Sequence, residues 1–310
     1  MDLFSIGELV IDFTPGSEPA SYIRNPGGAP ANVAIAAVRS GLEVGMCSSV
    51  GNDDFGRFLV QTLEENNVRV INPRLCDQAM TTMAFVTLAP DGDRSFTFAR
   101  KPGADMFLEE RDVREEDIAS SIIVHAGSCS LSASPVAEAT VRAMRLGSEM
   151  GKMVSFDVNY RNLMWNDDQN ACAAKVREIL PYVDLLKVSD EEVGMIGGQE
   201  GLLRLMESFQ IRVVVETLGG DGARCYFGGK VWDIPGKKVQ CVDTNGAGDA
   251  FWGGFLSSLR IQGVEDVGQL TENIVRRAME YGNAAGGLCV QGKGAIPSLP
   301  TRQQIEQFMV

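Results

Sequence analysis

Short runs of apolar and β-branched residues alternate along this chain with longer stretches of helical period. Helices are predicted over 54–66 and over 135–150, the second with Ser134 as its N-cap and Pro135 in its first turn. Three continuously apolar runs between such stretches are predicted as buried parallel strands: 153–157, 185–188 and 211–215. This alternation predicts an α/β fold with a doubly wound, mainly parallel sheet flanked by helices.

One region breaks the alternation. Strand-like runs at 82–88 and 94–100 are joined by residues 89–93, Ala-Pro-Asp-Gly-Asp, which is a turn composition. The pattern predicts a β-hairpin. It is either an ordinary antiparallel edge of the main sheet or, together with the extended run 20–24, a small separate sheet that could serve as a lid.

Composition narrows the function classes. The chain has 28 basic and 41 acidic residues, a net charge of −13, so it has no basic footprint for nucleic acid or for an anionic membrane. No apolar run reaches the length of a membrane span, and the first residues lack the basic region of a signal peptide, so a cytoplasmic protein is expected. Glycine is in excess, with 34 residues, which indicates many tight loops with exposed backbone amides.

Cysteine and histidine chemistry is sparse. The seven cysteines are widely scattered, which favours buried, reduced thiols over a disulfide framework or a CxxC zinc site. The one histidine, His125, lies in an apolar run, and we expect a core or strand-end role for it.

The segment 243–251, Asp-Thr-Asn-Gly-Ala-Gly-Asp-Ala-Phe, carries the strongest chemical signal, because a glycine-rich turn leads directly into a helical pattern. The free amides of Gly246, Ala247 and Gly248, with the helix dipole, would form an anion hole suited to phosphate. Asp249 then fits a catalytic base that takes the proton of an acceptor hydroxyl during phosphoryl transfer. Taken alone, the segment favours the simpler interpretation of an aspartate that caps the helix, so the rest of the chain must decide.

A second glycine segment follows the strand expected at 211–215. Its bare backbone would let a nucleotide approach closely, or it is simply a hairpin turn. The residues assigned to nucleotide binding here are Thr217, Gly219, Gly220 and Gly222.

Two other glycine patterns are rejected. Residues 287–294 almost match GxxxxGK[ST], but Gly294 supplies no hydroxyl for Mg²⁺ and the segment follows a helical run. The dinucleotide fingerprint GxGxxG is absent after an early strand, which argues against a nicotinamide-dependent enzyme.

Both glycine signatures together resemble one family. Residues 27–34, Gly-Gly-Ala-Pro-Ala-Asn-Val-Ala, followed by Gly51-Asn52-Asp53, resemble the amino-terminal signature of the ribokinase-like (PfkB) sugar kinases, and 243–249 resembles their carboxyl-terminal one. Within the family, the segments most similar to bacterial fructokinases are 7–12, expected as the opening strand, 104–106 and 157–165. The resemblance implies one ribokinase-like α/β domain with a β lid, with these bounds: domain 1–310, lid about 13–25 and 81–103.

The resemblance also implies roles on the sugar side. Asp12, Gly28 and Asn32 would hold sugar hydroxyls, and Arg161 would reach the sugar or the transferring phosphate. The substrate-binding set that this implies is Asp12, Gly27, Gly28, Asn32, Arg100 and Arg161, with Asp249 as the base.

On the nucleotide side, the resemblance places Lys187, Ser189 and Asn283 near ATP, with Asn283 in the adenine pocket. Ser189 stands where relatives commonly have the asparagine of Asn-x-x-Glu, whereas Glu192 is kept and would act on Mg²⁺ through a water molecule. The same two residues also fit a helix N-cap followed by an acidic first turn.

The sequence therefore predicts an ATP- and Mg²⁺-dependent sugar kinase, with fructose as acceptor, a monovalent cation such as K⁺ as a further cofactor, and a homodimer as assembly. A 2-keto-3-deoxygluconate kinase is the alternative, with Arg100 and Arg161 clamping the substrate carboxylate. Another sugar or nucleoside kinase of the family and a catalytically silent sugar or nucleotide sensor also remain open.

Overall fold

The strands form two sheets in this structure, a computed structural model that describes residues 1–18, 20–88 and 94–310. The larger sheet has the order β13-β12-β11-β10-β9-β8-β1-β4-β5, and its neighbours pair in parallel except where β12 meets β11 and β13. Its strands are β1 (Leu3–Ile6), β4 (Val44–Gly51), β5 (Arg69–Cys76), β8 (Ile123–Gly127), β9 (Met153–Asp157), β10 (Leu185–Ser189), β11 (Val213–Thr217), β12 (Gly222–Phe227) and β13 (Lys230–Pro235).

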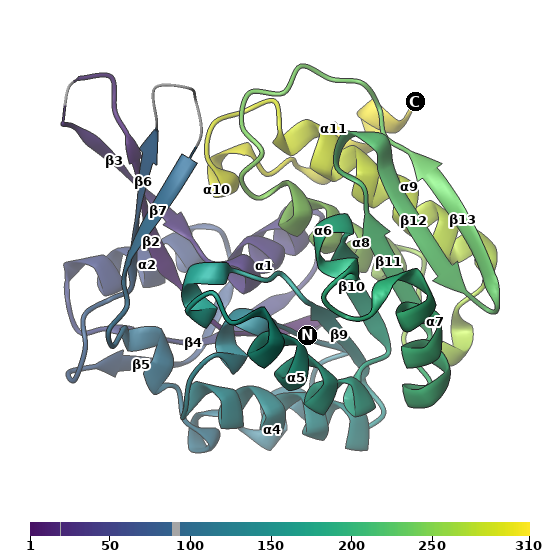
Figure 1. Ribbon diagram of the computed structural model, residues 1–310, viewed down its shortest axis with the longest axis horizontal. Helices are drawn as coiled ribbons and strands as arrows, with labels where there is room; N and C mark the ends of the chain where they lie inside the picture. The colour runs from purple at the N-terminus through teal and green to yellow at the C-terminus, as the bar shows by residue number, and fades with distance from the viewer. Residues whose placement is uncertain (19, 89–93) are drawn as a thin grey trace.

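Helices cover both faces of this sheet (Figure 1). A separate hydrophobic core lies between each face of the sheet and its helices, and adjacent strand residues alternate between the two cores. Leu185 belongs to the core that includes α1, α2, α8 and α9, whereas Leu186 belongs to the core that includes α3, α4, α5 and α7. The predicted doubly wound α/β fold is confirmed. The helices are α1 (Ala29–Arg39), α2 (Asp54–Glu65), α3 (Glu115–Ala119), α4 (Val136–Glu149), α5 (Gln169–Ile179), α6 (Asp190–Val193), α7 (Gly198–Phe209), α8 (Ala247–Ile261), α9 (Glu272–Cys289), α10 (Ala295–Ser298) and α11 (Arg302–Met309).

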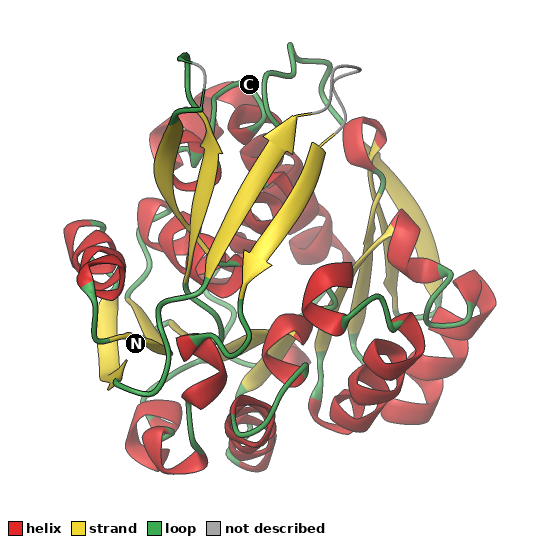
Figure 2. Ribbon diagram, turned by 60° about the vertical axis from the view of Figure 1, so that its left-hand side comes forward, coloured by secondary structure: helices red, strands yellow, loops and turns green. Residues whose placement is uncertain are grey.

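A small sheet stands apart from the main one (Figure 2). Its order is β3-β2-β6-β7, with antiparallel pairs except β2-β6, and its strands are β2 (Val10–Pro15), β3 (Tyr22–Gly27), β6 (Met83–Leu88) and β7 (Arg94–Ala99). The predicted hairpin is confirmed by the β6-β7 pairing. The turn 89–93 that the sequence places between these strands lies outside the described residues.

The first strand differs from the sequence expectation. The run 7–12 is not one strand, because β1 ends at Ile6 in the main sheet and β2 begins at Val10 in the small one. Gly7, at φ 147°, makes the break, and a Cβ there would lie 2.7 Å from Pro30 Cγ. The glycine thus transfers the chain from one sheet to the other.

Smaller differences concern caps and exposure. Helix α4 begins at Val136, and the Ser134 hydroxyl donates to Glu138 Oε1 (2.7 Å) instead of capping the helix backbone. All seven cysteines are free thiols, but Cys241 is exposed because it lies in the loop before α8. Across the residues that the structure describes, no helix is both long and apolar enough to cross a membrane.

Candidate active site

Asp249 lies in the first turn of α8, at the carboxyl edge of the main sheet, and is only 6% exposed. The turn before it depends on Gly246, the N-cap, which has φ 75° and packs so tightly that a Cβ would lie 2.6 Å from the Cβ of Ala295. Any larger residue would therefore displace the loop that orients the helix terminus.

Two amide side chains hold the Asp249 carboxylate. Asn32 Nδ2 donates to Oδ2 at 2.8 Å, and Asn159 Nδ2 donates to Oδ1 at 3.1 Å. Asn32 reaches it from α1, which packs against α8, and Asn159 from the loop that follows β9. Each oxygen of the carboxylate is thus held by one amide, which fixes the orientation that a general base requires.

The helix terminus offers backbone amides to an anion. The N–H groups of Gly246, Gly248 and Asp249 have no hydrogen-bond partner among the described residues, as expected for the first turn of a helix. The expected set needs one correction, because the N–H of Ala247 donates to the carbonyl of Thr244 (3.2 Å).

A buried cation lies behind this helix terminus. Lys187 on β10 donates to both carboxylate oxygens of Asp157 (2.8 and 3.0 Å), and a Cβ on Gly248 would lie 3.3 Å from its Nζ. Burial alone would lower the pKa of Lys187, but Asp157 and Glu192 outweigh it and raise the pKa. The ammonium therefore stays charged and adds to the positive field at the amides.

The predicted sugar side meets Asp249 from the small sheet. Asp12 on β2 lies against Gly27, where a side chain would collide with its carboxylate. Burial raises the pKa of Asp12 to about 6; Arg161 opposes this rise and Asp249 adds to it. Because the charges of Arg161 and Asp249 both act on Asp12, the three side chains lie near one another.

Two further features complete this side. Gly28, at φ 113°, approaches the Glu8 carbonyl so closely that only glycine fits. The Oδ1 atom of Asn32 is buried and has no hydrogen-bond partner among the described residues. An unsatisfied buried acceptor is costly, so it needs a donor such as a substrate hydroxyl.

Arg100 is already paired. Its Nη2 lies 2.8 Å from Asp105 Oδ2, and its Nη1 donates to the Ser132 hydroxyl at 3.1 Å. Both members of the ion pair are buried, so Asp105 already neutralises the charge of Arg100.

Sequence reasoning missed Glu8, which lies beside this pair. It is 3% exposed, and its Oε1 accepts the N–H of Ala29 (3.1 Å) at the start of α1. Burial raises its pKa to about 7, and Asp105 adds to the rise.

The segment that carries Ser189 forms a capping box at α6. The Ser189 hydroxyl accepts the N–H of Glu192, and Glu192 Oε2 accepts the N–H of Ser189 (2.8 Å). Glu192 Oε1 accepts the N–H of Tyr160 (2.7 Å), so both oxygens of this carboxylate hold backbone.

The glycine segment after β11 is open, as a nucleotide site requires. Gly219 and Gly220 have free space where a Cβ would point, while Gly222 is crowded by the backbone of β13. Thr217 ends β11 beside them. Asn283 lies late in α9, and its amide donates to the carbonyl of Ile234 (3.0 Å), which joins α9 to β13.

Residues 287–294 begin in α9 and not after a strand, so the rejection of a phosphate-binding loop there is confirmed. His125 is buried in β8, contacts Ser155 Oγ (3.0 Å) and has a pKa lowered to about 3 by burial, with Lys187 adding to the effect. The predicted core role of this histidine is confirmed.

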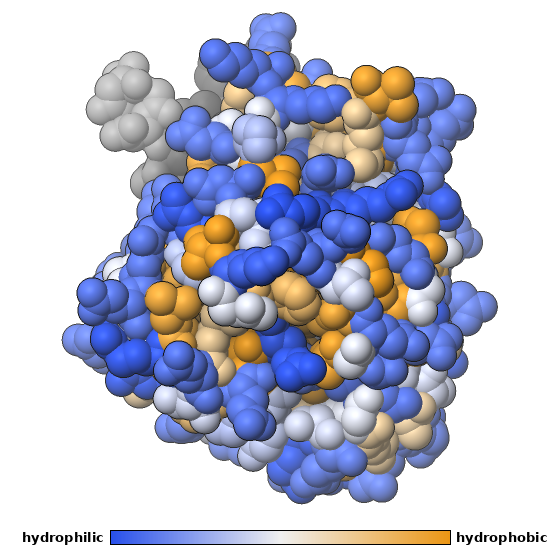
Figure 3. Space-filling view, turned by 90° about the vertical axis from the view of Figure 1, so that its right-hand side faces the viewer, coloured by the Kyte–Doolittle hydropathy of each residue, from blue (hydrophilic) through white to orange (hydrophobic). Residues whose placement is uncertain are grey.

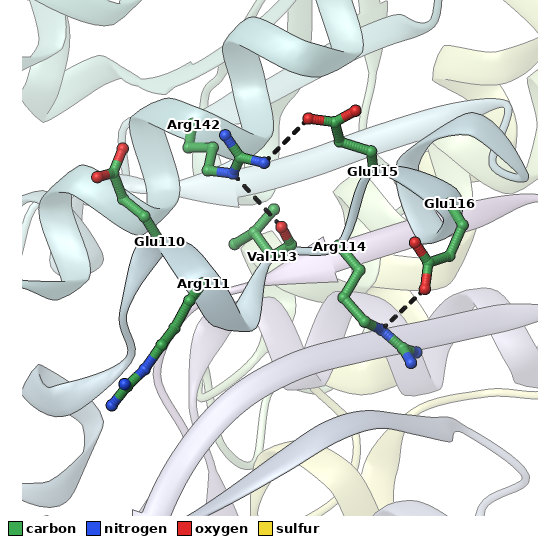
Figure 4. Close-up of a pocket in the computed structure, with 7 residues that line it drawn as sticks. All are labelled: Glu110, Arg111, Val113, Arg114, Glu115, Glu116 and Arg142. Atoms are coloured by element: carbon green, nitrogen blue, oxygen red, sulfur yellow. Dashed lines mark hydrogen bonds and ion pairs between the residues drawn. The ribbon is translucent and has the colours of Figure 1, made fainter.

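Two pockets lie apart from the candidate site residues. Over α7 and β13, apolar and polar side chains intermix (Figure 3), and a groove of about 560 Å³ is lined by residues such as Leu203 and Phe227. A second pocket of about 500 Å³ joins η2 (Glu110–Asp112), α3 and α4. Figure 4 shows Arg114 and Arg142 of its lining paired with Glu116 and Glu115. No candidate site residue lines either pocket.

Asn159 is the other residue that sequence reasoning did not assign. It stands in the quoted run 157–165, two residues after β9 ends in Asp157, the partner of Lys187. Its place after a buried parallel strand was the available signal, since such strand ends converge at one edge of a sheet.

Three features meet at the carboxyl edge of the doubly wound sheet: a carboxylate held by amides, unpaired backbone N–H groups at a helix terminus, and a buried lysine. Together they are typical of an enzyme that transfers phosphoryl groups to hydroxyls. The model of the pfkB family carbohydrate kinases matches residues 1–302, and the chain belongs to that family.

Individual relatives agree with this family. The chain is 37% identical to probable fructokinase-5 of Arabidopsis thaliana, covering 99% of this chain and 97% of the relative. The crystal structure of fructokinase with bound ATP from Xylella fastidiosa superposes with a TM-score of 0.91 at 29% identity, covering 99% and 98% of the two chains. A double mutant of fructokinase from Vibrio cholerae O395, in a form with fructose, ADP and potassium ion bound, gives a TM-score of 0.89 at 34% identity, covering 100% and 98%.

Proposed function

We propose that this carbohydrate kinase transfers the γ-phosphoryl group of ATP to a hydroxyl of fructose. The observation that carries the proposal is the buried Asp249 carboxylate, held by two amides beside unpaired backbone N–H groups. The relatives named fructokinase, and the Vibrio cholerae structure with fructose and ADP, support the choice of sugar.

In this mechanism the acceptor hydroxyl lies between Asp249 and the groups of Asp12 and Asn32. The hydroxyl oxygen forms a bond to the γ-phosphorus, the bond from that phosphorus to the bridging β,γ-oxygen breaks, and ADP leaves. Asp249 accepts the hydroxyl proton. The N–H groups of Gly246, Gly248 and Asp249 donate to the transferring phosphoryl oxygens and stabilise their charge.

The residues present suit a magnesium ion held mainly by phosphate and water. Among the described residues no three His, Cys, Asp or Glu side chains cluster as a metal site, and Mg²⁺ usually keeps several waters and binds substrate phosphates. When bound, Mg²⁺ neutralises charge on the phosphates. Glu192 would hold one of its waters, and K⁺, which the Vibrio cholerae structure contains, is proposed as a further cofactor.

The small sheet is proposed to act as a lid on a single 1–310 domain. It carries Asp12 and Gly27, so its strands must approach the main sheet for these residues to meet the sugar and Asp249. Closure would exclude water, which otherwise competes with the sugar for the phosphoryl group.

The alternative acceptor, 2-keto-3-deoxygluconate, finds less support. Its carboxylate needs a cationic clamp, and Arg100 is engaged by Asp105. Arg161 remains, but Asp12 and Asp249 already lie near it, and a substrate carboxylate would add to their negative charge. A catalytically silent sensor would have no need of the two amides that hold Asp249.

A homodimer and a cytoplasmic location belong to the same proposal. Strand β3 is an edge strand that exposes Tyr22 and Ile23, and such edges are often covered by a second chain. The free thiols suit a reducing compartment. Sedimentation of the purified protein measures the assembly.

Phosphorus NMR of a reaction with ATP, Mg²⁺ and fructose tests the proposed transfer. We expect a phosphomonoester signal from the sugar that rises in step with ADP. ADP formed with inorganic phosphate, and no sugar phosphate, would overturn the assignment of fructose as acceptor.

A further inference from the structure

Asn159 is a buried residue on an unusual backbone. It is 5% exposed and has φ 40°, in the left-handed region that asparagine tolerates better than most side chains. Its amide donates to Asp249 Oδ1 at 3.1 Å. A position that demands this conformation and places a donor on the candidate base is unusual enough to need a reason.

The backbone on both sides of Asn159 is anchored. The N–H of Val158 donates to the carbonyl of Lys187 (3.0 Å), and the N–H of Tyr160 donates to the Glu192 carboxylate (2.7 Å). Cys129 Sγ contacts the carbonyl of Asn159 itself (3.7 Å). These anchors leave the amide little freedom to turn away from Asp249.

The two amides on Asp249 are not equivalent. Asn32 has a free buried oxygen that can serve a substrate hydroxyl, so its contact with Asp249 can change when sugar binds. Asn159 is anchored through its own backbone and donates to the other oxygen of the carboxylate. It is therefore the contact that can persist through the reaction.

We propose, on the basis of the proposed function, that Asn159 is a positioning residue that fixes the orientation of the Asp249 carboxylate toward the acceptor hydroxyl. Both acidic and basic groups lie near Asp249, so the neighbouring charges do not take the place of the hydrogen bond from Asn159. Those neighbours are Asp12 on β2, Asp157 on β9, Arg161 in the next loop, Lys187 on β10 and the thiol of Cys289 on α9.

The test uses Asn159→Gly and Asn159→Asp. Glycine removes the amide and accepts the positive φ, and aspartate keeps the shape and replaces the donor by a like charge. Asn67→Gly is the control, because Asn67 is an exposed asparagine with φ 59° at the end of α2. Circular dichroism and thermal melting show that each variant is folded.

We expect kcat to fall by about 10- to 100-fold in Asn159→Gly, the range for losing a hydrogen bond to a charged group, with KM for ATP and sugar within about threefold. The acidic limb of the kcat/KM profile should move to higher pH in both variants, and further in Asn159→Asp, because a like charge disfavours the ionised base. The control should match the wild type. A purely structural role would lower the melting temperature without moving the pH profile.

The assays use whichever sugar of a panel the wild type phosphorylates fastest. A normal kcat and an unmoved acidic limb in the two Asn159 variants would overturn this role while the kinase function stands. A wild type that phosphorylates no sugar would overturn both, so the two failures are distinguishable.

Discussion

Replacement of Asp249 by asparagine removes the candidate base with little change in shape. The new side chain keeps one oxygen, which can accept from one of the two neighbouring amides, and presents an NH₂ group to the other. Asn32 can turn to meet that NH₂, because its Oδ1 atom has no partner among the described residues. The variant should therefore fold and bind ATP normally.

The expected loss separates a base from a helix cap. General-base catalysis contributes about 10²- to 10⁴-fold, which corresponds to about 3 to 5 kcal/mol of activation free energy. A first-turn carboxylate that only complements the helix dipole contributes about 0.3 to 1 kcal/mol to stability and nothing to turnover. We expect kcat of Asp249→Asn to fall by about 10²-fold or more.

A coupled assay of ADP formation measures kcat, and calorimetry measures ATP binding in the same preparations. Asp54→Asn is the matched control, since Asp54 is an exposed carboxylate in the first turn of α2 whose ion-pair partner, within the part of the chain that the structure describes, is the surface residue Arg57. Turnover of Asp249→Asn within a few-fold of the wild type, with ATP bound, would refute the catalytic role of Asp249.

Three further outcomes follow from the same structure. Lys293 is exposed in the loop after α9, so Lys293→Ala should reduce kcat far less than Asp249→Asn does, and an equal loss would restore the phosphate-loop interpretation. Hydrogen exchange along β3 should slow when sugar is added, and unchanged protection at saturating sugar would contradict a lid. Glu8 has a pKa of about 7 in the folded protein against 4.5 as its ordinary value, so folding takes up a proton between these pH values. The free energy of unfolding of the wild type should therefore fall relative to that of Glu8→Gln by about 1.4 kcal/mol per pH unit as pH rises through this range. Denaturant melts of both proteins measure this difference, and a difference that stays constant with pH would show that Glu8 stays ionised.

Much of the fold could be predicted because its signals are local. The strand 153–157 is continuously apolar and buried on both faces, and it was found with its bounds unchanged as β9. The glycine turn before α8 was equally readable, because it lies directly before an apolar helical pattern. The break at Gly7 was not, since nothing in the run 7–12 distinguishes one strand from two strands in different sheets.

The candidate site was only partly predictable, because its contacts join distant segments. Asp249 was readable from its own loop, but Asn159 is 90 positions away and its role appears only when β9 and α8 are placed side by side. The pairing of Arg100 with Asp105 is likewise invisible to composition, although it decides whether that guanidinium is free to bind substrate.

We expect this carbohydrate kinase to prefer a neutral ketohexose. The most direct test compares kcat/KM for fructose and 2-keto-3-deoxygluconate at equal ATP and Mg²⁺. The hydroxyls of a neutral sugar suit Asp12 and the free oxygen of Asn32, whereas Arg100 is paired with Asp105. We therefore expect a larger kcat/KM for fructose. A larger value for the sugar acid would contradict it.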